Sequence, residues 1–531
     1  MRNEEDTTSP VAGGATATAT AAPGVIDYAP TTERELDRRW VTGALMLVMV
    51  LASMEQTVTS TAMPTIIGDL HGLEHYSWVA SIYLLACTVT MPLYGRLADA
   101  LGRKRVIVGS ILLFMAGSVL AAYAHSMTQL IVYRGLQGLG AGGIMPVVLT
   151  ILGDIFTLEE RAKIQGFFSA VWGTASLAGP ALGAFLVGGF GWRAVFLINL
   201  PLGAMGLGVL IWKYHDQQKA HPMDLDLPGL GALATACMAL LALVSRLGPD
   251  GWSWPAIAAL TATTVVATLF FVWHERRTSN PILPPALIMR RAIGPSIAAS
   301  FLFGLGFLCL DTYVPLYVQG GRGGGVAAAA SVVTPIMFTW ALSAMVGAPL
   351  LVRWGFRKTA LAGASLIVLG FVGLLICAKL AAPHWVLTGV LALTGFGFGP
   401  ASMSYLLAAQ DDVEWQQRGI VTSAVGFFRT IGGALGVGLL GAMFNAIVAK
   451  DLDRLRAAGV TPATLLDPHA STALPPALAA DAHRTIAAGL TWVFVAMLVA
   501  VIVQWAITCL MPARSCNHTV KVSEGMEAMA G

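Results

Sequence analysis

Long apolar runs alternate with short polar connections along almost the whole chain. A helix needs about 20 apolar residues to cross a bilayer, and these runs have that length. They predict fourteen membrane-spanning helices, near residues 41–63, 76–95, 105–124, 129–152, 163–188, 193–213, 228–246, 253–274, 293–318, 327–352, 358–380, 384–408, 417–446 and 487–511. The pattern therefore predicts an all-α integral membrane protein.

Lysine and arginine gather in every second connection, beginning with the one after the second span. Short cytoplasmic loops carry an excess of these residues. The alternation keeps its phase along the chain, which favours an even number of spans with both termini in the cytoplasm. We expect a multi-pass protein of the plasma membrane, the inner membrane in bacteria.

Composition narrows the possible functions. The chain is 56% hydrophobic and 11% charged, against about 25% charged in soluble domains. A net charge of +3 is too small to indicate that the chain binds nucleic acid. The six cysteines form no C-x-x-C pair, and no nucleotide loop or nucleophile–base pair is present. We therefore expect no enzyme activity, metal or organic cofactor.

The fifth and thirteenth spans resemble each other in sequence, as in an internal repeat, since Ala181–Gly183 and Ala434–Gly436 both read A-L-G. Duplicated membrane halves with a site between them are common in transporters. The expected organisation is a disordered cytoplasmic tail, a six-helix bundle, a linker with two extra helices, a second six-helix bundle and a cytoplasmic tail. These parts take residues 1–39, 40–213, 214–290, 291–511 and 512–531.

The connection after the second span, GRLADALGRKRV, holds five charged residues in twelve. Asp99 can accept hydrogen bonds from Arg103 or from a helix N-terminus. Gly95 allows two helices to approach closely, and Gly102, Arg103 and Lys104 complete the stretch. Topology alone explains the basic residues but not the aspartate and glycines, so we expect a gating loop that latches two halves together.

Arg134 stands within the fourth span, in RGLQGLGAG, with Gln137 on the same helical face. A charge at this depth costs at least about 2.5 kcal/mol unless it is paired or hydrated. In the fifth span, AGPALG places Gly179 and Gly183 four residues apart, which suits close helix packing. Pro180 removes a backbone hydrogen bond there and bends the helix.

These stretches resemble signatures of the major facilitator superfamily. GRLADALGRK is similar to its loop signature G-x-L-A-D-R-x-G-R-K, although Ala100 stands where arginine is usual. RGLQG resembles its helix-four signature, whose arginine is linked to proton transfer, and AGPALG resembles its antiporter signature. MEQTVTSTAMPTI resembles the first-helix signature of the fourteen-helix drug:proton antiporters, the EmrB/QacA-type branch. The implied fold is two six-helix bundles related by pseudo-twofold symmetry, plus two inserted linker helices.

Two carboxylates lie within predicted spans, Glu55 in the first and Asp311 in the ninth. Each is costly in lipid and should face the bundle interior. The hypothesis is that Glu55 or Asp311 carries a coupling proton, with Arg134 as charge partner. Candidates for a substrate cavity are Gln137, Trp172, Tyr313 and Arg429.

The expected function is secondary active transport, in which a proton-coupled antiporter exports hydrophobic or amphipathic drugs by alternating access. The alternative is a proton-coupled symporter that imports a small nutrient. Expected partners are the lipid bilayer, protons and a small-molecule substrate, and not nucleic acid. We expect a monomer, with periplasmic adaptor and outer-membrane partners if the cell is Gram-negative.

Overall fold

The computed structural model describes residues 32–70, 76–215, 226–245, 253–457 and 476–513. Within these ranges the chain is helical and contains no strand. The first helices are α1 (Thr32–Leu70), α2 (Tyr76–Leu101), α3 (Arg103–Ala122), α4 (Met127–Ile155), α5 (Leu158–Phe190), α6 (Arg193–Leu197), α7 (Asn199–Lys213), α8 (Leu227–Ser245) and α9 (Trp254–Glu275). The others are α10 (Pro285–Ile288), α11 (Ile293–Leu316), α12 (Val326–Lys379), α13 (His384–Asp411), α14 (Arg418–Ala457) and α17 (Pro476–Cys509), with a π-helical turn at Tyr317–Gly321 and a 3₁₀ turn at Trp415–Gln417.

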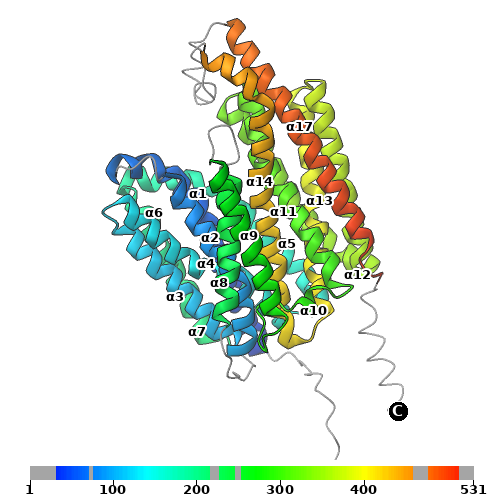
Figure 1. Cartoon of the computed structure of the whole chain (residues 1–531). Helices are drawn as coiled ribbons and strands as arrows, with labels where there is room; N and C mark the ends of the chain where they lie inside the picture. Colours follow the sequence, from blue (N-terminus) through cyan, green and yellow to red (C-terminus); the bar gives the residue numbers. More distant parts are fainter. Residues whose placement is uncertain (1–31, 71–75, 216–225, 246–252, 458–475, 514–531) are drawn as a thin grey trace, which may run out of the picture.

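The helices form two groups that lie side by side (Figure 1). In the first half, α1–α7, helix α1 packs on α5 and α7, and α4 packs on α2 and α3. In the second half, α11–α17, helix α11 packs on α14 and α17, and α12 on α13. Each half has its own buried apolar clusters. Because each group buries apolar side chains within itself, the structure consists of two helical bundles.

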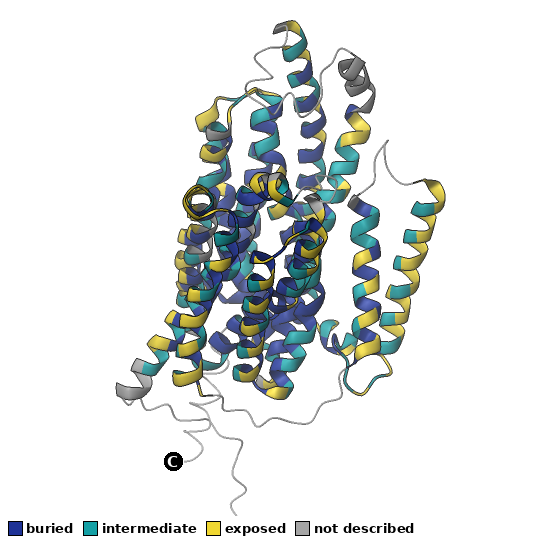
Figure 2. Cartoon of the chain, turned by 90° about the vertical axis from the view of Figure 1, so that its left-hand side faces the viewer, coloured by how far each residue is buried: buried dark blue, intermediate teal, exposed yellow. Residues whose placement is uncertain are grey.

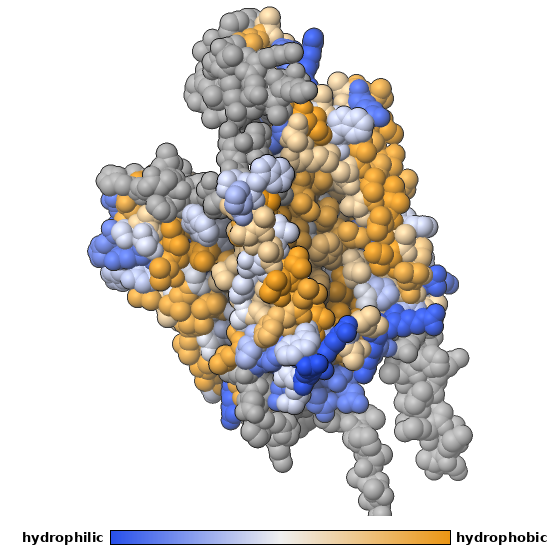
Figure 3. Space-filling view, viewed as in Figure 1, coloured by the Kyte–Doolittle hydropathy of each residue, from blue (hydrophilic) through white to orange (hydrophobic). Residues whose placement is uncertain are grey.

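Twelve helices in the described part of the chain are long and apolar enough to cross a membrane. One of them, over Ala328–Lys379, is 52 residues long. The 33-residue helix α5 is not among the twelve. Apolar residues cover the middle of the surface in Figure 3, and hydrophilic residues gather towards its lower end. The described chain is thus an all-helical membrane protein, and the count of fourteen spans stays a prediction.

Gly355 interrupts α12 with φ 78° and ψ 171°, a conformation open to glycine and strained for other residues. It falls between the predicted spans 327–352 and 358–380. Gly102, before α3, has nearly the same conformation, with φ 94° and ψ 146°. Both glycines precede basic residues, Arg103 in one half and Arg357 in the other. The stretches GRK at Gly102–Lys104 and GFRK at Gly355–Lys358 are therefore similar in backbone conformation as well as in sequence.

Helices α8 and α9 pack on each other and lie beside the two halves. Leu233 and Cys237 of α8 join a buried cluster with Met91 of α2 and Ile297 of α11. Helix α9 is largely exposed, as its outer position in Figure 2 shows, and only 6% of its most apolar stretch is buried. The inner helix of this pair therefore contacts both halves, whereas the outer one presents an apolar face to the surroundings.

Part of the predicted disordered tail, residues 1–39, is helical. Residues 32–39 form the first turns of α1, and only residues 1–31 of that tail lie outside the described ranges. Asp37 pairs with Lys213 of α7 at 2.8 Å, and Arg38 pairs with Glu160 of α5. These ion pairs tie the turns to neighbouring helices, which explains why a polar stretch is ordered. Of the predicted C-terminal tail, residues 514–531 lie outside the described ranges.

Candidate functional site

Glu55 of α1 and Arg134 of α4 form an ion pair inside the first half. Their side chains are each only 1% exposed. Arg134 Nη1 donates to Glu55 Oε1, and the guanidinium lies over the Tyr83 ring with its carbon 4.2 Å from the ring centroid. Two opposite charges removed from water in this way stabilise each other only while both remain charged. The partner that the sequence required for Arg134 is present.

Three further side chains extend a polar network around this pair. Gln137 accepts from Arg134 Nη1 at 2.7 Å and donates to Ser118 Oγ at 2.6 Å. Asn199, the first residue of α7, donates to Glu55 Oε2 at 2.5 Å and to Ser118 at 3.0 Å. Every member is buried. The network therefore links α1, α3, α4 and α7, and a change of charge on Glu55 reaches all four helices.

The predicted gating loop joins the two halves at one end of the molecule, here called the loop end. Asp99, near the end of α2, accepts from the backbone N–H groups of Gly419 and Ile420 at 3.1 and 2.8 Å. These groups belong to the first turn of α14, where the helix dipole favours a negative charge. Asp99 also accepts from Arg103 Nη2 at 3.0 Å. Both predicted partners of Asp99 are confirmed.

Asp154, at the end of α4, extends this latch. Arg103 Nε lies 2.9 Å from Asp154 Oδ2, and Arg418 Nη1 of α14 lies 3.8 Å from Asp154 Oδ1. Arg418 also donates to the Gly153 carbonyl at 3.0 Å. The loop signature lacks an arginine at Ala100, and Arg418 supplies a cation to the latch from the opposite half. Lys104 donates to the Ile211 carbonyl at 2.7 Å and so fixes α3 to α7.

Glycines set how closely helices cross in both regions. A Cβ on Gly95 would lie 2.0 Å from Ser423 Oγ and 2.5 Å from the Gly419 carbonyl oxygen, so only glycine fits between α2 and α14. In the same way, a Cβ on Gly179 of α5 would lie 1.9 Å from Thr57 Oγ1 of α1, and a Cβ on Gly183 would lie 1.9 Å from Thr61 Oγ1. The predicted close packing of α5 is confirmed. The side chains of Pro180 and Trp172 lie outside the described part of the chain.

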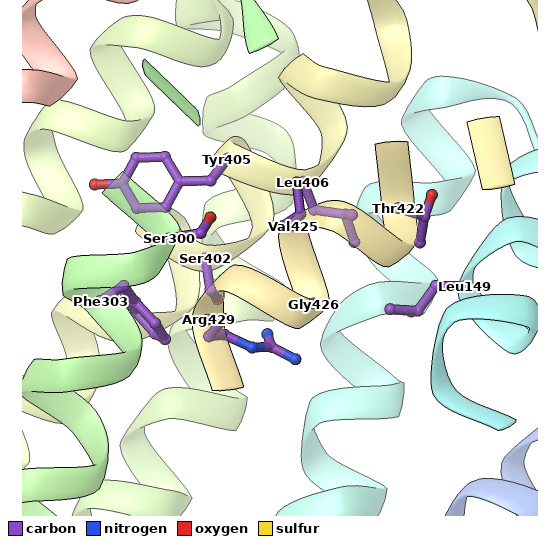
Figure 4. Close-up of a pocket in the computed structure, with 10 residues that line it drawn as sticks. All are labelled: Leu149, Ser300, Phe303, Ser402, Tyr405, Leu406, Thr422, Val425, Gly426 and Arg429. Atoms are coloured by element: carbon purple, nitrogen blue, oxygen red, sulfur yellow. The ribbon is translucent and has the colours of Figure 1, made fainter. Parts of the chain in front are cut away.

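A cavity of about 20 Å³ lies where the two halves meet (Figure 4). Leu149 of α4 faces it from the first half, and residues of α11, α13 and α14 surround it from the second. Its lining is Leu149, Ser300, Phe303, Ser402, Tyr405, Leu406, Thr422, Val425, Gly426 and Arg429. In Figure 4 the Arg429 side chain extends from α14 towards the helix that carries Leu149. This cavity contains hydroxyl groups, two aromatic rings and one cation.

Only one of the described cavity candidates lines this space. Arg429 does, whereas Gln137 belongs to the Glu55 network and is 0% exposed. Tyr313 is buried, and its hydroxyl donates to the Val437 carbonyl of α14, so it holds α11 against α14 instead. Neither residue lines this cavity, because spacing along a helix does not show which side faces a neighbouring helix, and a role for them at a substrate stays a prediction.

Asp311 is exposed, and the described residues provide it with no ion pair or hydrogen bond. It does not join Glu55 and Arg134, which lie in the other half. Asp311 is four residues from Phe307, which packs on Trp340, and seven from Gly304, which contacts α14. Helical spacing therefore turns it to the side between α12 and α14. The expectation that Asp311 faces the bundle interior stays a prediction.

Sequence reasoning missed Ser118, Asn199 and Asp154. Asn199 is the single amide in the apolar run VFLINLPLG, and Asp154 is the only acid near the end of the fourth span. Both were visible as isolated polar residues in apolar surroundings, where such residues need partners. In the described ranges, no three His, Cys, Asp or Glu side chains gather in a way that could hold a metal ion.

The comparison with known proteins agrees with this geometry. A model of the Major Facilitator Superfamily matches residues 45–437. The chain belongs to the major facilitator superfamily. Multidrug transporter protein MdtP of Bacillus subtilis (strain 168) is 35% identical to this chain over 407 residues, which are 76% of this chain and 75% of that protein. Multidrug resistance protein 3 of the same organism is 30% identical over 428 residues, 80% of this chain and 83% of that protein.

Solved structures agree on the fold. The proton:xylose symporter XylE superposes on this chain with a TM-score of 0.56 at 14% identity, and the match covers 90% of this chain and 96% of that one. At that identity the likeness concerns the fold alone. The protein is therefore a multi-pass membrane transporter. Multidrug transporters are among its relatives, and its family consists of transporters and not of enzymes.

Proposed function

We propose that the chain is a proton-coupled antiporter that exports hydrophobic or amphipathic compounds by alternating access. The observation that carries this proposal is the buried pair of Glu55 and Arg134 with its network of amides and hydroxyls. Glu55 is the one member of that network whose side chain can bind and release a proton. The names of the two Bacillus subtilis relatives favour drugs as the substrates.

The coupling step follows from the charges. Protonation of Glu55 removes the negative charge that Arg134 faces, and the guanidinium is left buried without a counter-ion. Such an uncompensated charge is costly, on the order of 3–5 kcal/mol when a buried pair is broken. The network then favours a different arrangement of α1, α4 and α7. One proton crossing a potential of 100 mV supplies about 2.3 kcal/mol, a comparable amount.

The latch gives the two states of the transporter. Asp99 reaches the first turn of α14 only while the halves touch at the loop end. We assign the loop end to the cytoplasm because basic residues gather there. In this conformation the cavity is then closed towards the cytoplasm, and rocking the halves apart at the latch exposes it to that side.

We assign the chain to the fourteen-helix drug:proton antiporter branch. Dividing α12 at Gly355 and adding α5 raises the twelve candidate spans to fourteen. In this proposal α8 and α9 are the two inserted linker helices, and both termini are cytoplasmic. The protein works in the plasma membrane as a monomer with the proton gradient as its energy source, needs no organic cofactor or metal, and joins adaptor proteins if the cell is Gram-negative.

The test compares Glu55→Gln with Asp311→Asn, two variants that each remove one carboxylate charge. Purified protein in liposomes is given a pH gradient, and movement of a fluorescent drug is followed together with proton flux. The Glu55→Gln variant should insert normally, but its gradient-driven transport should fall to the background rate. The Asp311→Asn variant should keep most of the wild-type transport activity. Export by Glu55→Gln at the wild-type rate would rule out this coupling site.

The same assay separates export from uptake. In an antiporter the drug gradient drives protons in the opposite direction, and in a symporter in the same direction. Proton movement along with the drug would favour the alternative, proton-coupled import of a nutrient. No proton movement with any compound of a broad panel would refute proton coupling altogether.

A further inference from the structure

Arg429 is a cation deep within the second half that has no anionic partner in the described part of the chain. It lies eleven residues beyond Arg418, the first residue of α14, which is about 16 Å along the helix axis. Arg103 and Arg134, in contrast, are each held by carboxylates. Arg429 is partly buried, and its side chain extends into the cavity between the halves.

The carboxylates on neighbouring helices do not neutralise it. Asp99 and Asp154 bind Arg103 at the loop end. Asp311 is seven residues further along α11 than Gly304, which contacts the Arg429 backbone. Seven residues are about 10 Å of helix, and no ion pair joins Asp311 to Arg429. A guanidinium at this depth requires an anion, other polar acceptors or water around it. The described residues provide Arg429 with no anion, so the cavity favours a ligand with a negative charge.

The lining suits an organic anion. The Ser300 hydroxyl faces the same cavity and has no hydrogen-bond partner among the described residues, so it can donate next to Arg429. Phe303, Leu406 and Val425 supply apolar walls around these two donors. The space of about 20 Å³ holds little more than one small polar group. The apolar body of a larger molecule then has to lie between the halves, on the side away from the closed latch.

We propose that Arg429, assisted by Ser300, binds the anionic group of amphipathic substrates, and that carboxylates are the preferred class. The inference rests on the proposed export function and specifies its substrates. A guanidinium holds a carboxylate with two parallel hydrogen bonds, which lysine cannot reproduce. Substrates with a carboxylate should therefore be favoured over neutral molecules of the same shape.

The test uses an amphipathic fluorescent dye with a free carboxylate and the methyl ester of the same dye. Binding to detergent-purified wild-type protein is measured first, by fluorescence titration. The carboxylate should bind at least about tenfold more tightly than the ester, as expected for one charge-assisted hydrogen bond. Equal affinity, or tighter binding of the ester, overturns the proposal without the need for any variant.

Variants then locate the site. The ratio of carboxylate to ester transport in liposomes should fall at least about tenfold in Arg429→Gln, with partial retention in Arg429→Lys and a smaller fall in Ser300→Ala. Arg353→Gln removes the same charge from an exposed position outside the cavity and should leave the ratio unchanged. A ratio unchanged in Arg429→Gln overturns the assignment.

Failure of the site and failure of export give different results. Transport of the ester but not of the carboxylate leaves proton-driven export intact and refutes the anion site. Tight, selective binding of the carboxylate with no gradient-driven transport of either dye supports the anion site and refutes export.

Discussion

Arg134 is held by a geometry that only a guanidinium provides. Its Nη1 atom donates to both Glu55 and Gln137, while its flat face lies over the Tyr83 ring. A lysine ammonium carries the same charge but is a compact, strongly hydrated point without this fork. The residue at this position is therefore specified by hydrogen-bond directions as well as by charge.

Arg134→Lys should lower gradient-driven transport by at least about tenfold, because one or two charged hydrogen bonds of about 1.5–3 kcal/mol each are lost. Arg193→Lys is the matched control, since Arg193 pairs with Asp69 on the exposed surface, where such pairs contribute about 0–1 kcal/mol. Transport is measured in liposomes with equal amounts of inserted protein. Wild-type activity of Arg134→Lys would show that charge alone suffices.

At the scale of helices, the contact between α1 and α5 depends on the absence of side chains. A Cβ on Gly183 would lie 1.9 Å from Thr61 Oγ1 and 3.1 Å from the Val58 carbonyl oxygen. The first contact involves a side chain that can be removed, and the second is tight but not prohibitive. The two helices can approach each other because a glycine of one faces a threonine of the other.

Gly183→Ala should therefore destabilise the protein, and adding Thr61→Ala should restore much of the loss. For residues in direct contact, a coupling of about 0.5–3 kcal/mol is expected. The unfolding temperature in detergent measures both variants. Gly188→Ala is the control in the same helix, where a Cβ meets nothing within 4 Å and alanine favours the helix by about 1 kcal/mol. Equal losses in the single and double variants would contradict this packing account.

Over the whole molecule, Asp99 contributes one polar contact between the halves, at the loop end. The carboxylate belongs to α2, and the amide groups that it binds belong to α14. Charge at a helix N-terminus is favourable by about 0.3–1 kcal/mol, and more where it is partly buried. This stabilisation exists only while the halves are in contact, so it biases the equilibrium towards a closed loop end.

Asp99→Ala should shift that equilibrium towards separation at the loop end. Spin labels at Arg105 and Glu414, both exposed and on opposite halves, report the change as a longer distance in double electron–electron resonance. Asp69→Ala, which removes an exposed carboxylate paired with Arg193, is the control. An unchanged distance distribution in Asp99→Ala would mean that the latch does not set the equilibrium.

Much of this protein was determined by the sequence alone. Apolar runs of bilayer length and the shortage of charge require a membrane-embedded helical protein, since such a surface is unfavourable in water. An arginine inside one of those runs requires a partner, and a loop with Gly95 and Asp99 predicts a close helix contact with an anchored carboxylate. These conclusions depend on solvent and local chemistry, which composition and spacing specify.

The tertiary structure decided which groups meet. Glu55, and not Asp311, is the partner of Arg134, because α1 packs against α4 within the same half. Asn199 reaches Glu55 from 144 residues away, and Arg418 reaches the latch from the opposite half. Arg429 faces a cavity, and none of the described residues gives it a counter-ion. Electrostatic pairing acts over a few ångströms, so it depends on how helices are packed, and the order of residues along the chain does not specify that packing.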